Sequence, residues 1–170
     1  MTLFFALAAY ALAMTAANLI LAGAVGAWGR ESIAIVSPLN AFFLIGLDLA
    51  MRDWLQVQLS RTCMLLLIAG TGLLTYFLNP GAGHIAVASA VAFTGAALVD
   101  WSIFTRLRAR PWIFRSNASN AGGALVDSLI FPALTFGALM PQVVVLQFLA
   151  KTAGGAIWSW LIARRLGGVR

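Results

Sequence analysis

Two charged residues, Asp127 and Lys151, stand inside long apolar stretches of the second half of the chain. Asp127 lies 14 residues before Pro141, and Lys151 lies 10 residues after it. If both stretches are helices that meet at Pro141, a rise of about 1.5 Å per residue puts the charges roughly 21 and 15 Å from the turn, within about one helical turn in depth. A charge at that depth in a bilayer is costly unless paired or hydrated, so we expect both to face the interior of a helix bundle.

Helical spacing predicts which residues share a face with each charge. Steps of three, four and seven residues give Asn120, Gly123, Phe131 and Thr135 around Asp127, and Gln147, Gly154, Gly155 and Trp158 around Lys151. Amides, charges, aromatic rings and small residues together are typical of a site for a flat polar ligand. The alternative is a buried salt bridge that only fixes helix packing. Asn18, in the first apolar stretch, would either bond across helices or reach the same cavity.

A second polar group occupies an earlier apolar stretch. Asp48, Arg52 and Gln56 follow one another at four-residue steps, which predicts a polar ladder along one helix face. Arg52 would then brace Asp48 while Gln56 faces a pathway through the bundle. The alternative is a ladder of charges that reach from the membrane boundary to water. Asp100 lies close to the same boundary, as a further pathway or coupling candidate or as a structural partner of Arg106.

The elements that must position these side chains are membrane-spanning helices. Of the 170 residues, 62% are hydrophobic and only 9% are charged, far from the averages of soluble domains. The apolar residues form blocks of about 20 residues, the length of a helix that crosses a bilayer. We predict an all-α, polytopic membrane protein with one domain, residues 1–170, and six transmembrane helices at 3–27, 33–51, 62–78, 85–104, 117–140 and 143–163.

The arginines lie mostly on one side of these predicted spans. Six spans put both termini on the same side, and that side receives nine arginines, while the opposite loops hold only Arg30. Because positively charged loops stay in the cytoplasm, we expect both termini there. This topology and contact with lipid headgroups account for the net charge of +6, so we expect no nucleic-acid partner.

Few residues in this sequence fit a catalytic or metal-binding pattern. The one histidine, His84, has no second His or Cys at ligand spacing, and the lone Cys63 offers neither a disulfide nor a metal pair. No Ser/His dyad fits within the spans, and no glycine loop of the P-loop type occurs. We therefore expect no enzyme activity, no metal and no cofactor.

A series of residues in fixed order resembles a known family. The matching positions are residues 48–53, Gln56, 100–108, Trp112, Ser119, 123–128, Phe131 and Phe136. They resemble the VUT family, the bacterial queuosine-precursor transporters also described as vitamin uptake transporters, over residues 40–155, Lys151 included. The resemblance implies a six-helix inner-membrane protein, similar to the substrate-binding subunits of energy-coupling-factor transporters. It also implies import of 7-cyano-7-deazaguanine or 7-aminomethyl-7-deazaguanine.

The implied ligand suits the residues already identified. A deazaguanine carries a ring N–H beside an exocyclic amino group, and a carboxylate accepts hydrogen bonds from both. Asp127 is the candidate for that role. The other candidates are Lys151, Asn120 and Gln147 for the ring carbonyl or the nitrile, and Phe131, Trp101 and Trp158 for stacking.

The energy source and the assembly stay open at this stage. No nucleotide-binding motif is present, so import is driven by metabolic trapping, by ion coupling through an aspartate, or by a separate ATPase. In the last case the chain would be the substrate-binding subunit for a vitamin-like or nucleobase-like solute. The small-residue stripe Ala9, Ala13 and Ala17 would then be its docking face. A homo-oligomer is also compatible with the sequence.

The arginine asymmetry predicts where the C-terminus lies. A reporter that is active only in the cytoplasm, fused after Arg170, is expected to be active. A reporter that works only in the periplasm, fused at the same position, is the matched control and is expected to be silent. The reverse result would contradict both the count of six spans and the depth argument for Asp127 and Lys151.

Overall fold

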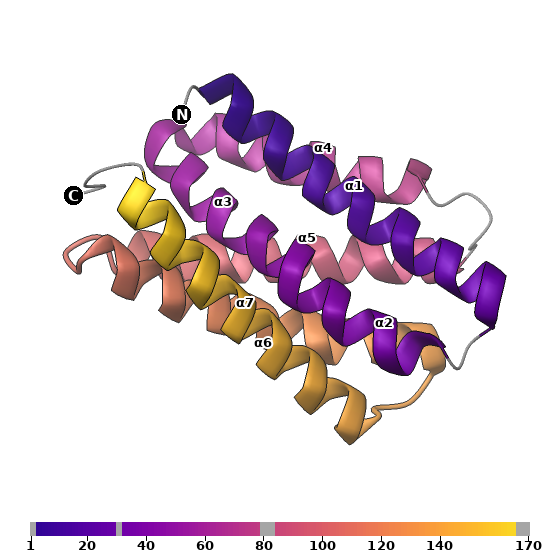
Figure 1. Cartoon of the computed structure of the whole chain (residues 1–170). Coiled ribbons are helices and arrows are strands. Elements are labelled where there is room, and N and C mark those ends of the chain that lie inside the picture. Colours follow the sequence, from indigo (N-terminus) through magenta and orange to yellow (C-terminus); the bar gives the residue numbers. More distant parts are fainter. Residues whose placement is uncertain (1–2, 30–31, 79–83, 166–170) are drawn as a thin grey trace.

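The computed structural model describes residues 3–29, 32–78 and 84–165, and all regular elements in these ranges are helical (Figure 1). They are α1 (Leu3–Trp28), α2 (Ile33–Asn40), the π-helix η2 (Ala41–Ile45), α3 (Gly46–Gln58), α4 (Arg61–Leu78), α5 (His84–Arg106), α6 (Trp112–Phe136) and α7 (Pro141–Arg165). Helices α2, η2 and α3 form one continuous rod, because Ala41 and Ile45 at their junctions keep right-handed helical dihedrals. The all-helical class predicted from the sequence is confirmed.

Three helical segments of the described residues are long and apolar enough to cross a membrane. They are Leu3–Trp28, Ile35–Gln58 and Val87–Arg106. The other three spans stay a prediction. The rod through α3 runs past the predicted end at residue 51 to Gln58, and α6 begins at Trp112 rather than residue 117. Each extension includes an arginine, Arg52 in the first and Arg115 in the second.

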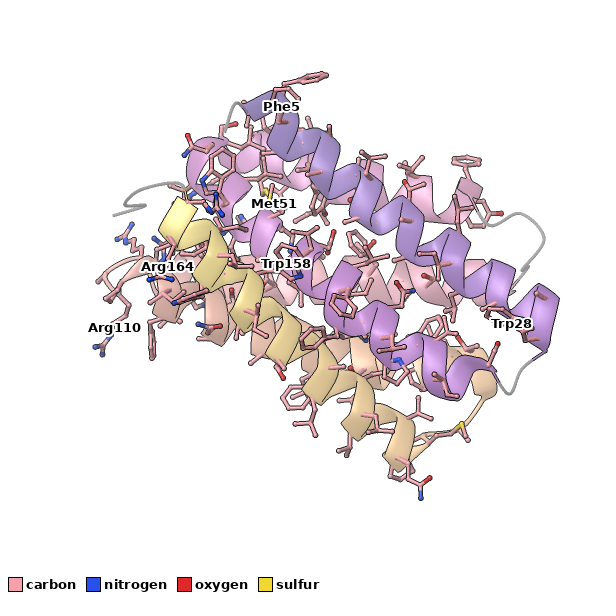
Figure 2. All side chains as sticks on the ribbon, viewed as in Figure 1. Phe5, Trp28, Met51, Arg110, Trp158 and Arg164 are labelled. Atoms are coloured by element: carbon pink, nitrogen blue, oxygen red, sulfur yellow. The ribbon has the colours of Figure 1, made fainter. Side chains whose placement is uncertain are left out.

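The bundle has two distinct ends. The start of α1 and the end of α7 lie at the same end, together with the connection between α5 and α6 (Figure 1). Arg110 and Arg164 lie at this end, and Trp28 lies at the opposite end (Figure 2). We call these the arginine end and the Trp28 end.

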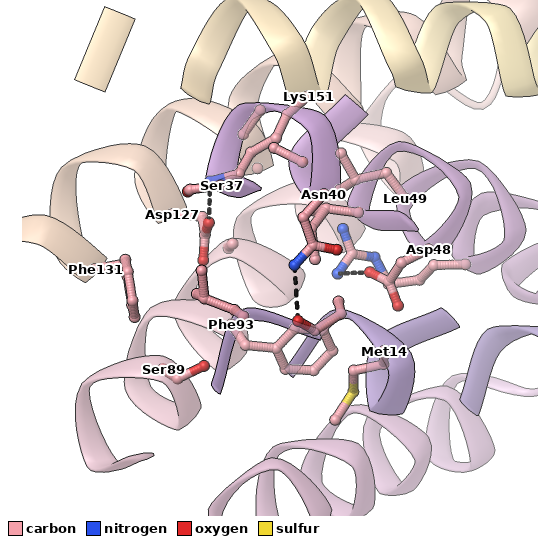
Figure 3. A pocket seen from close by; sticks show the side chains of 18 residues that line it. Met14, Ser37, Asn40, Asp48, Leu49, Ser89, Phe93, Asp127, Phe131 and Lys151 are labelled. Atoms are coloured by element: carbon pink, nitrogen blue, oxygen red, sulfur yellow. Dashed lines mark hydrogen bonds and ion pairs between the residues drawn. The ribbon is translucent and has the colours of Figure 1, made fainter. Parts of the chain in front are cut away.

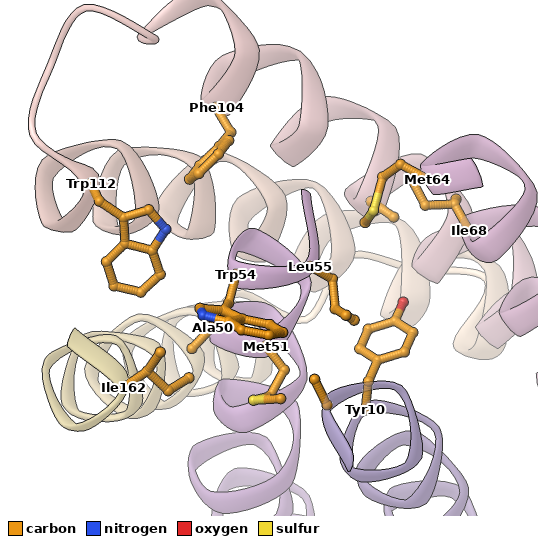
Figure 4. Packing of buried hydrophobic residues seen from close by; sticks show 12 residues of the cluster. Tyr10, Ala50, Met51, Trp54, Leu55, Met64, Ile68, Phe104, Trp112 and Ile162 are labelled. Atoms are coloured by element: carbon orange, nitrogen blue, oxygen red, sulfur yellow. The ribbon is translucent and has the colours of Figure 1, made fainter. Parts of the chain in front are cut away.

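The apolar core lies in the half of the bundle toward the arginine end. Side chains from α1, α3, α4, α5, α6 and α7 contribute to it (Figure 4). Its fully or nearly fully buried members include Tyr10, Leu55, Met64 and Phe104. Several helices thus close the arginine end with large side chains, and the space near the middle of the bundle stays available for a cavity.

The stripe of alanines on α1 is used inside the bundle. Ala13 and Ala17 are each only 4% exposed, and Ala9 packs against the apolar core. Small residues at four-residue spacing let neighbouring helices approach closely. The stripe therefore serves packing within the chain and is not available as an outward docking face.

The rod of α2, η2 and α3 meets α7 backbone to backbone. A Cβ atom at Gly154 would lie 2.0 Å from the Phe42 carbonyl oxygen, and a Cβ atom at Gly46 would lie 2.6 Å from the Gly154 carbonyl carbon. No side chain fits at such distances. Glycine at both positions is the condition for this contact, which holds Lys151 of α7 close to the middle of the rod.

The π-helix at Ala41–Ile45 lies at this contact. Pro38 inside α2 has no N–H to donate and so interrupts the hydrogen-bond ladder just before it. The Trp158 indole of α7 donates a 2.9 Å hydrogen bond to the Phe43 carbonyl of this π-helix. Single π turns in α-helices are common at functional sites.

Substitution of Gly154 tests this close contact. Gly154→Ala forces the backbones of the rod and α7 apart, so it should destabilise the protein by about 1–3 kcal/mol, read as a lower temperature of unfolding in detergent. Gly70→Ala is the matched control, because nothing lies within 4 Å of a Cβ atom there. The control should be unchanged or slightly more stable. Equal unfolding temperatures for the two variants would contradict the close contact.

Candidate functional site

A cavity lies in the middle of the bundle and extends toward the Trp28 end. It encloses about 770 Å³ of empty space, its open mouth included. The lining residues come from α1, the α2–η2–α3 rod, α5, α6 and α7. Polar or aromatic members are Ser37, Asn40, Asp48, Arg52, Ser89, Phe93, Asp127, Phe131 and Lys151.

Asp127 and Lys151 form an ion pair at one wall of the cavity (Figure 3). Lys151 Nζ donates to Asp127 Oδ2, to Gln147 Oε1 at 2.8 Å and to Ser128 Oγ at 3.3 Å. The lysine side chain is 4% exposed, whereas the Asp127 side chain is 23% exposed. The ammonium group is therefore fully engaged by protein, and the carboxylate keeps a face toward the cavity.

A second charged group lines another part of the same cavity. Arg52 Nε donates a 3.0 Å hydrogen bond to Asp100 Oδ2, which fixes the guanidinium from behind. Arg52 Nη1 lies 4.0 Å from Asp48 Oδ2, one turn earlier on α3, so this pair is loose. Asp100 is paired with Arg52 rather than with Arg106, because a six-residue step on α5 leads to a different helix face.

Three polar atoms at this part of the cavity lack partners. Asp48 Oδ1, Arg52 Nη2 and Asn40 Oδ1 are buried and have no hydrogen-bond partner among the residues that the structure describes. The Asn40 amide nitrogen donates to the Ala17 carbonyl at 2.7 Å, which fixes the orientation of the side chain. Buried polar groups without partners cost free energy. Two acceptors and one donor are thus available to a ligand or to water.

The two charged groups and two aromatic rings surround one space. In Figure 3, Asn40 lies between the Asp127–Lys151 pair and Asp48. Phe93 and Phe131 line the same cavity, and the Arg52 guanidinium lies 6.0 Å from the centre of the Phe93 ring. Rings, carboxylates and cations in one cavity can stack on a flat ligand and bond to its edges.

Two predicted ligand residues serve as supports for other side chains. Gln147 accepts from Lys151 and donates to Ser37 Oγ at 2.9 Å. Asn120 donates weakly to the hydroxyls of Ser116 at 3.3 Å and Ser159 at 3.4 Å. Neither residue lines the cavity, although Gly123 on the same predicted face does.

The remaining predicted residues lie elsewhere. Trp158 is engaged with the backbone of the π-helix. Gln56 and Trp101 line a second pocket of about 460 Å³ at the arginine end, its open mouth included. In that pocket the Gln56 amide donates to the Trp101 carbonyl at 3.1 Å and to Thr105 Oγ1 at 2.9 Å. The side chain of Asn18 falls outside the described part of the structure.

Sequence reasoning missed four polar or aromatic lining residues, Ser37, Asn40, Ser89 and Phe93. A signal was present for two of them. Ser37 and Asn40 are polar positions within an apolar stretch and precede Asp48 on the same rod. Phe93 carries no such signal, because an aromatic residue in an apolar helix faces lipid or the protein core equally well.

Comparison with known protein families gives one match. A family described as putative vitamin uptake transporter matches residues 2–164 of the chain. The chain belongs to this family. Its membership in the vitamin uptake transporter family confirms the resemblance found in the sequence, and together with the apolar helices it makes the chain a membrane protein of a transport family. No curated protein and no solved structure matches the chain.

Proposed function

We propose that this vitamin uptake transporter imports a queuosine precursor, 7-cyano-7-deazaguanine or 7-aminomethyl-7-deazaguanine, through six spans in the bacterial inner membrane. The observation that carries the proposal is the cavity with two separate carboxylate–cation pairs, Asp127–Lys151 and Asp48–Arg52, next to Phe93 and Phe131. An apolar vitamin would not require four charged groups at such a depth, where each unpaired charge is costly.

The position of the cavity supports import. With the arginine end in the cytoplasm, as the positive-inside rule predicts, the cavity extends toward the external face. The apolar core around Leu55 and Phe104 then closes the cytoplasmic half. This arrangement corresponds to an outward-facing carrier, in which a solute enters from outside and the seal opens afterwards.

The chemistry of the cavity suits a guanine-like edge. Asp127 keeps a partly exposed carboxylate, which is free to accept the ring N–H and the exocyclic amino group as a pair. Arg52 Nη2 is available to donate to the ring carbonyl, and Asp48 Oδ1 accepts from a further N–H. The two rings would hold the flat bicycle. In 7-aminomethyl-7-deazaguanine the amine is cationic and would pair with the second carboxylate of the cavity.

The alanine stripe no longer favours the alternative of a subunit that requires a separate ATPase. Because Ala13 and Ala17 are buried within the chain, that stripe does not supply a docking face. We therefore propose that the chain is a carrier in its own right.

Uptake in cells tests the function directly. A bacterial strain that can neither make nor import the precursor, and that lacks any energising ATPase of this type, is given the gene and 7-cyano-7-deazaguanine. We expect queuosine to appear in its tRNA. Gly70→Ala, remote from the cavity, should behave as the parent. No queuosine, despite folded protein in the membrane, would reject the proposed substrate or the stand-alone carrier.

Ligand competition tests whether Asp127 reads the base. A 7-deazapurine without the exocyclic amino group keeps its stacking surface but leaves part of the carboxylate without a donor. The parent protein should prefer the amino compound by about 1.5–3 kcal/mol, the value of a hydrogen bond to a charged group. In Asp127→Ala this preference should largely disappear.

Competition binding on purified protein measures both values. Phe131→Leu is the matched control, because it weakens stacking for both ligands and should leave the preference intact. Equal preference in the parent and in Asp127→Ala would mean that the Asp127–Lys151 pair only holds helices together and that another residue reads the base.

A further inference from the structure

A layer of buried polar side chains lies beyond the cavity, toward the arginine end. Asp53 of α3 accepts hydrogen bonds from Ser116 at 2.6 Å and from Ser119 at 3.2 Å, both on α6. Ser159 of α7 lies 2.7 Å from the Ser116 hydroxyl. Asp53 and the three serines have no exposed surface. This layer plays no part in the ligand contacts proposed above.

Asp100 of α5 lies beside Asp53, with the two side chains within hydrogen-bonding reach. Asp100 Oδ2 accepts from Arg52, but Asp100 Oδ1 has no donor among the described residues. Ser119 also approaches Asp100, yet its one proton is directed to Asp53 Oδ1 at 3.2 Å or to the Ser116 carbonyl at 3.1 Å. Asp100 Oδ1 is therefore a buried acceptor beside a second carboxyl group, and no donor among the described residues reaches it.

The surrounding charges do not balance these carboxyl groups. The charged or titratable groups that act on the pair are Arg52 and Asp48 of α3, Arg115 of α6 and Tyr10 of α1. Arg115 donates to the Phe104 carbonyl at 3.3 Å and stacks 4.0 Å from the Phe104 ring, so its guanidinium is engaged elsewhere. Within the described residues, Arg52 is the cation that contacts the cluster directly. One guanidinium thus serves three buried carboxyl groups, and adjacent carboxylates in a low-dielectric interior cannot all ionise.

The Asp53–Asp100 pair lies between the cavity and the second pocket, which open toward opposite ends of the bundle. On α3, Arg52 lines the cavity and Gln56, one turn later, lines the second pocket. On α5, Ala96 lines the cavity and Trp101 lines the second pocket. Asp53 and Asp100 fall between these positions on the same two helices. A group at that depth can exchange with water on either side in turn as the carrier changes state.

We infer that Asp53 and Asp100 share one proton, and that this proton is the ion that the carrier moves together with its substrate. The shared proton supplies the missing donor to Asp100 Oδ1. In one cycle the pair releases the proton to water in the cytoplasmic pocket and takes another from water in the cavity. The pair returns to its starting state, and no electrons move. The coupling step rests on the proposed transport function, whereas the shared proton does not.

Infrared spectroscopy tests the shared proton without any ligand. Purified parent protein in detergent at neutral pH should show the carbonyl stretch of a protonated, buried carboxylic acid, shifted in D₂O. Asp53→Asn should lack this band, because its amide replaces the acid and donates to Asp100 in the proton's place. Asp48→Asn removes another carboxyl beside Arg52 and should keep the band. Absence of the band in the parent, or its survival in Asp53→Asn, would overturn the inference.

Transport in vesicles tests the coupling. The parent in proteoliposomes should take up labelled 7-cyano-7-deazaguanine severalfold faster under an inward proton gradient. Asp53→Asn should bind the compound as the parent does, since Asp53 does not line the cavity, but its uptake should not respond to the gradient.

The possible failures are distinguishable. A parent that binds and transports the compound but ignores the gradient overturns the coupling and leaves the proposed function standing. A parent that neither binds nor transports it rejects the proposed function, and the infrared band then decides the shared proton on its own.

Discussion

Arg52 is the cation on which the interior of this bundle depends. Its side chain is 1% exposed, and the carboxyl groups of Asp48, Asp53 and Asp100 around it are 2%, 0% and 0% exposed. Removal of Arg52 would leave buried carboxyl groups without a compensating cation, which is far more costly than the loss of one contact. The rod of α2, η2 and α3 must therefore hold Arg52 against α5 whenever the bundle is closed, and the other helices pack around that requirement.

Much of the fold and the depth of the charges could be predicted from the sequence. Apolar blocks predict helices because, inside a bilayer, backbone N–H and C=O groups can form hydrogen bonds only with one another. Helix rise is constant, so counting from Pro141 places Asp127 and Lys151 at a common depth, and the structure brings them together in an ion pair. That Asp127 and Lys151 contact a ligand stays a prediction, because a common depth is expected both for a structural ion pair and for a ligand site.

The orientation of each helix about its own axis could not be predicted to the same degree. Residues three, four and seven apart share a face more than 100° wide, and the neighbours of the helix decide which part of it meets the cavity. Gly123 therefore lines the cavity while Asn120, three residues earlier, bonds to Ser159 of α7. The π turn at Ala41–Ile45 adds a further change of rotation within the rod, which no periodicity reveals.

The same contacts that close the bundle also limit how it can open. Helices α3 and α7 meet backbone to backbone at Gly46 and Gly154, so they are expected to move together rather than to separate. Between α3 and α5, by contrast, the central contacts are polar: Arg52 with Asp100, and Gln56 with Thr105. When water enters, these polar groups can replace their hydrogen bonds to each other with hydrogen bonds to water. A passage from the cavity to the second pocket is therefore most easily opened along the α3–α5 seam, where the charges and the shared proton lie.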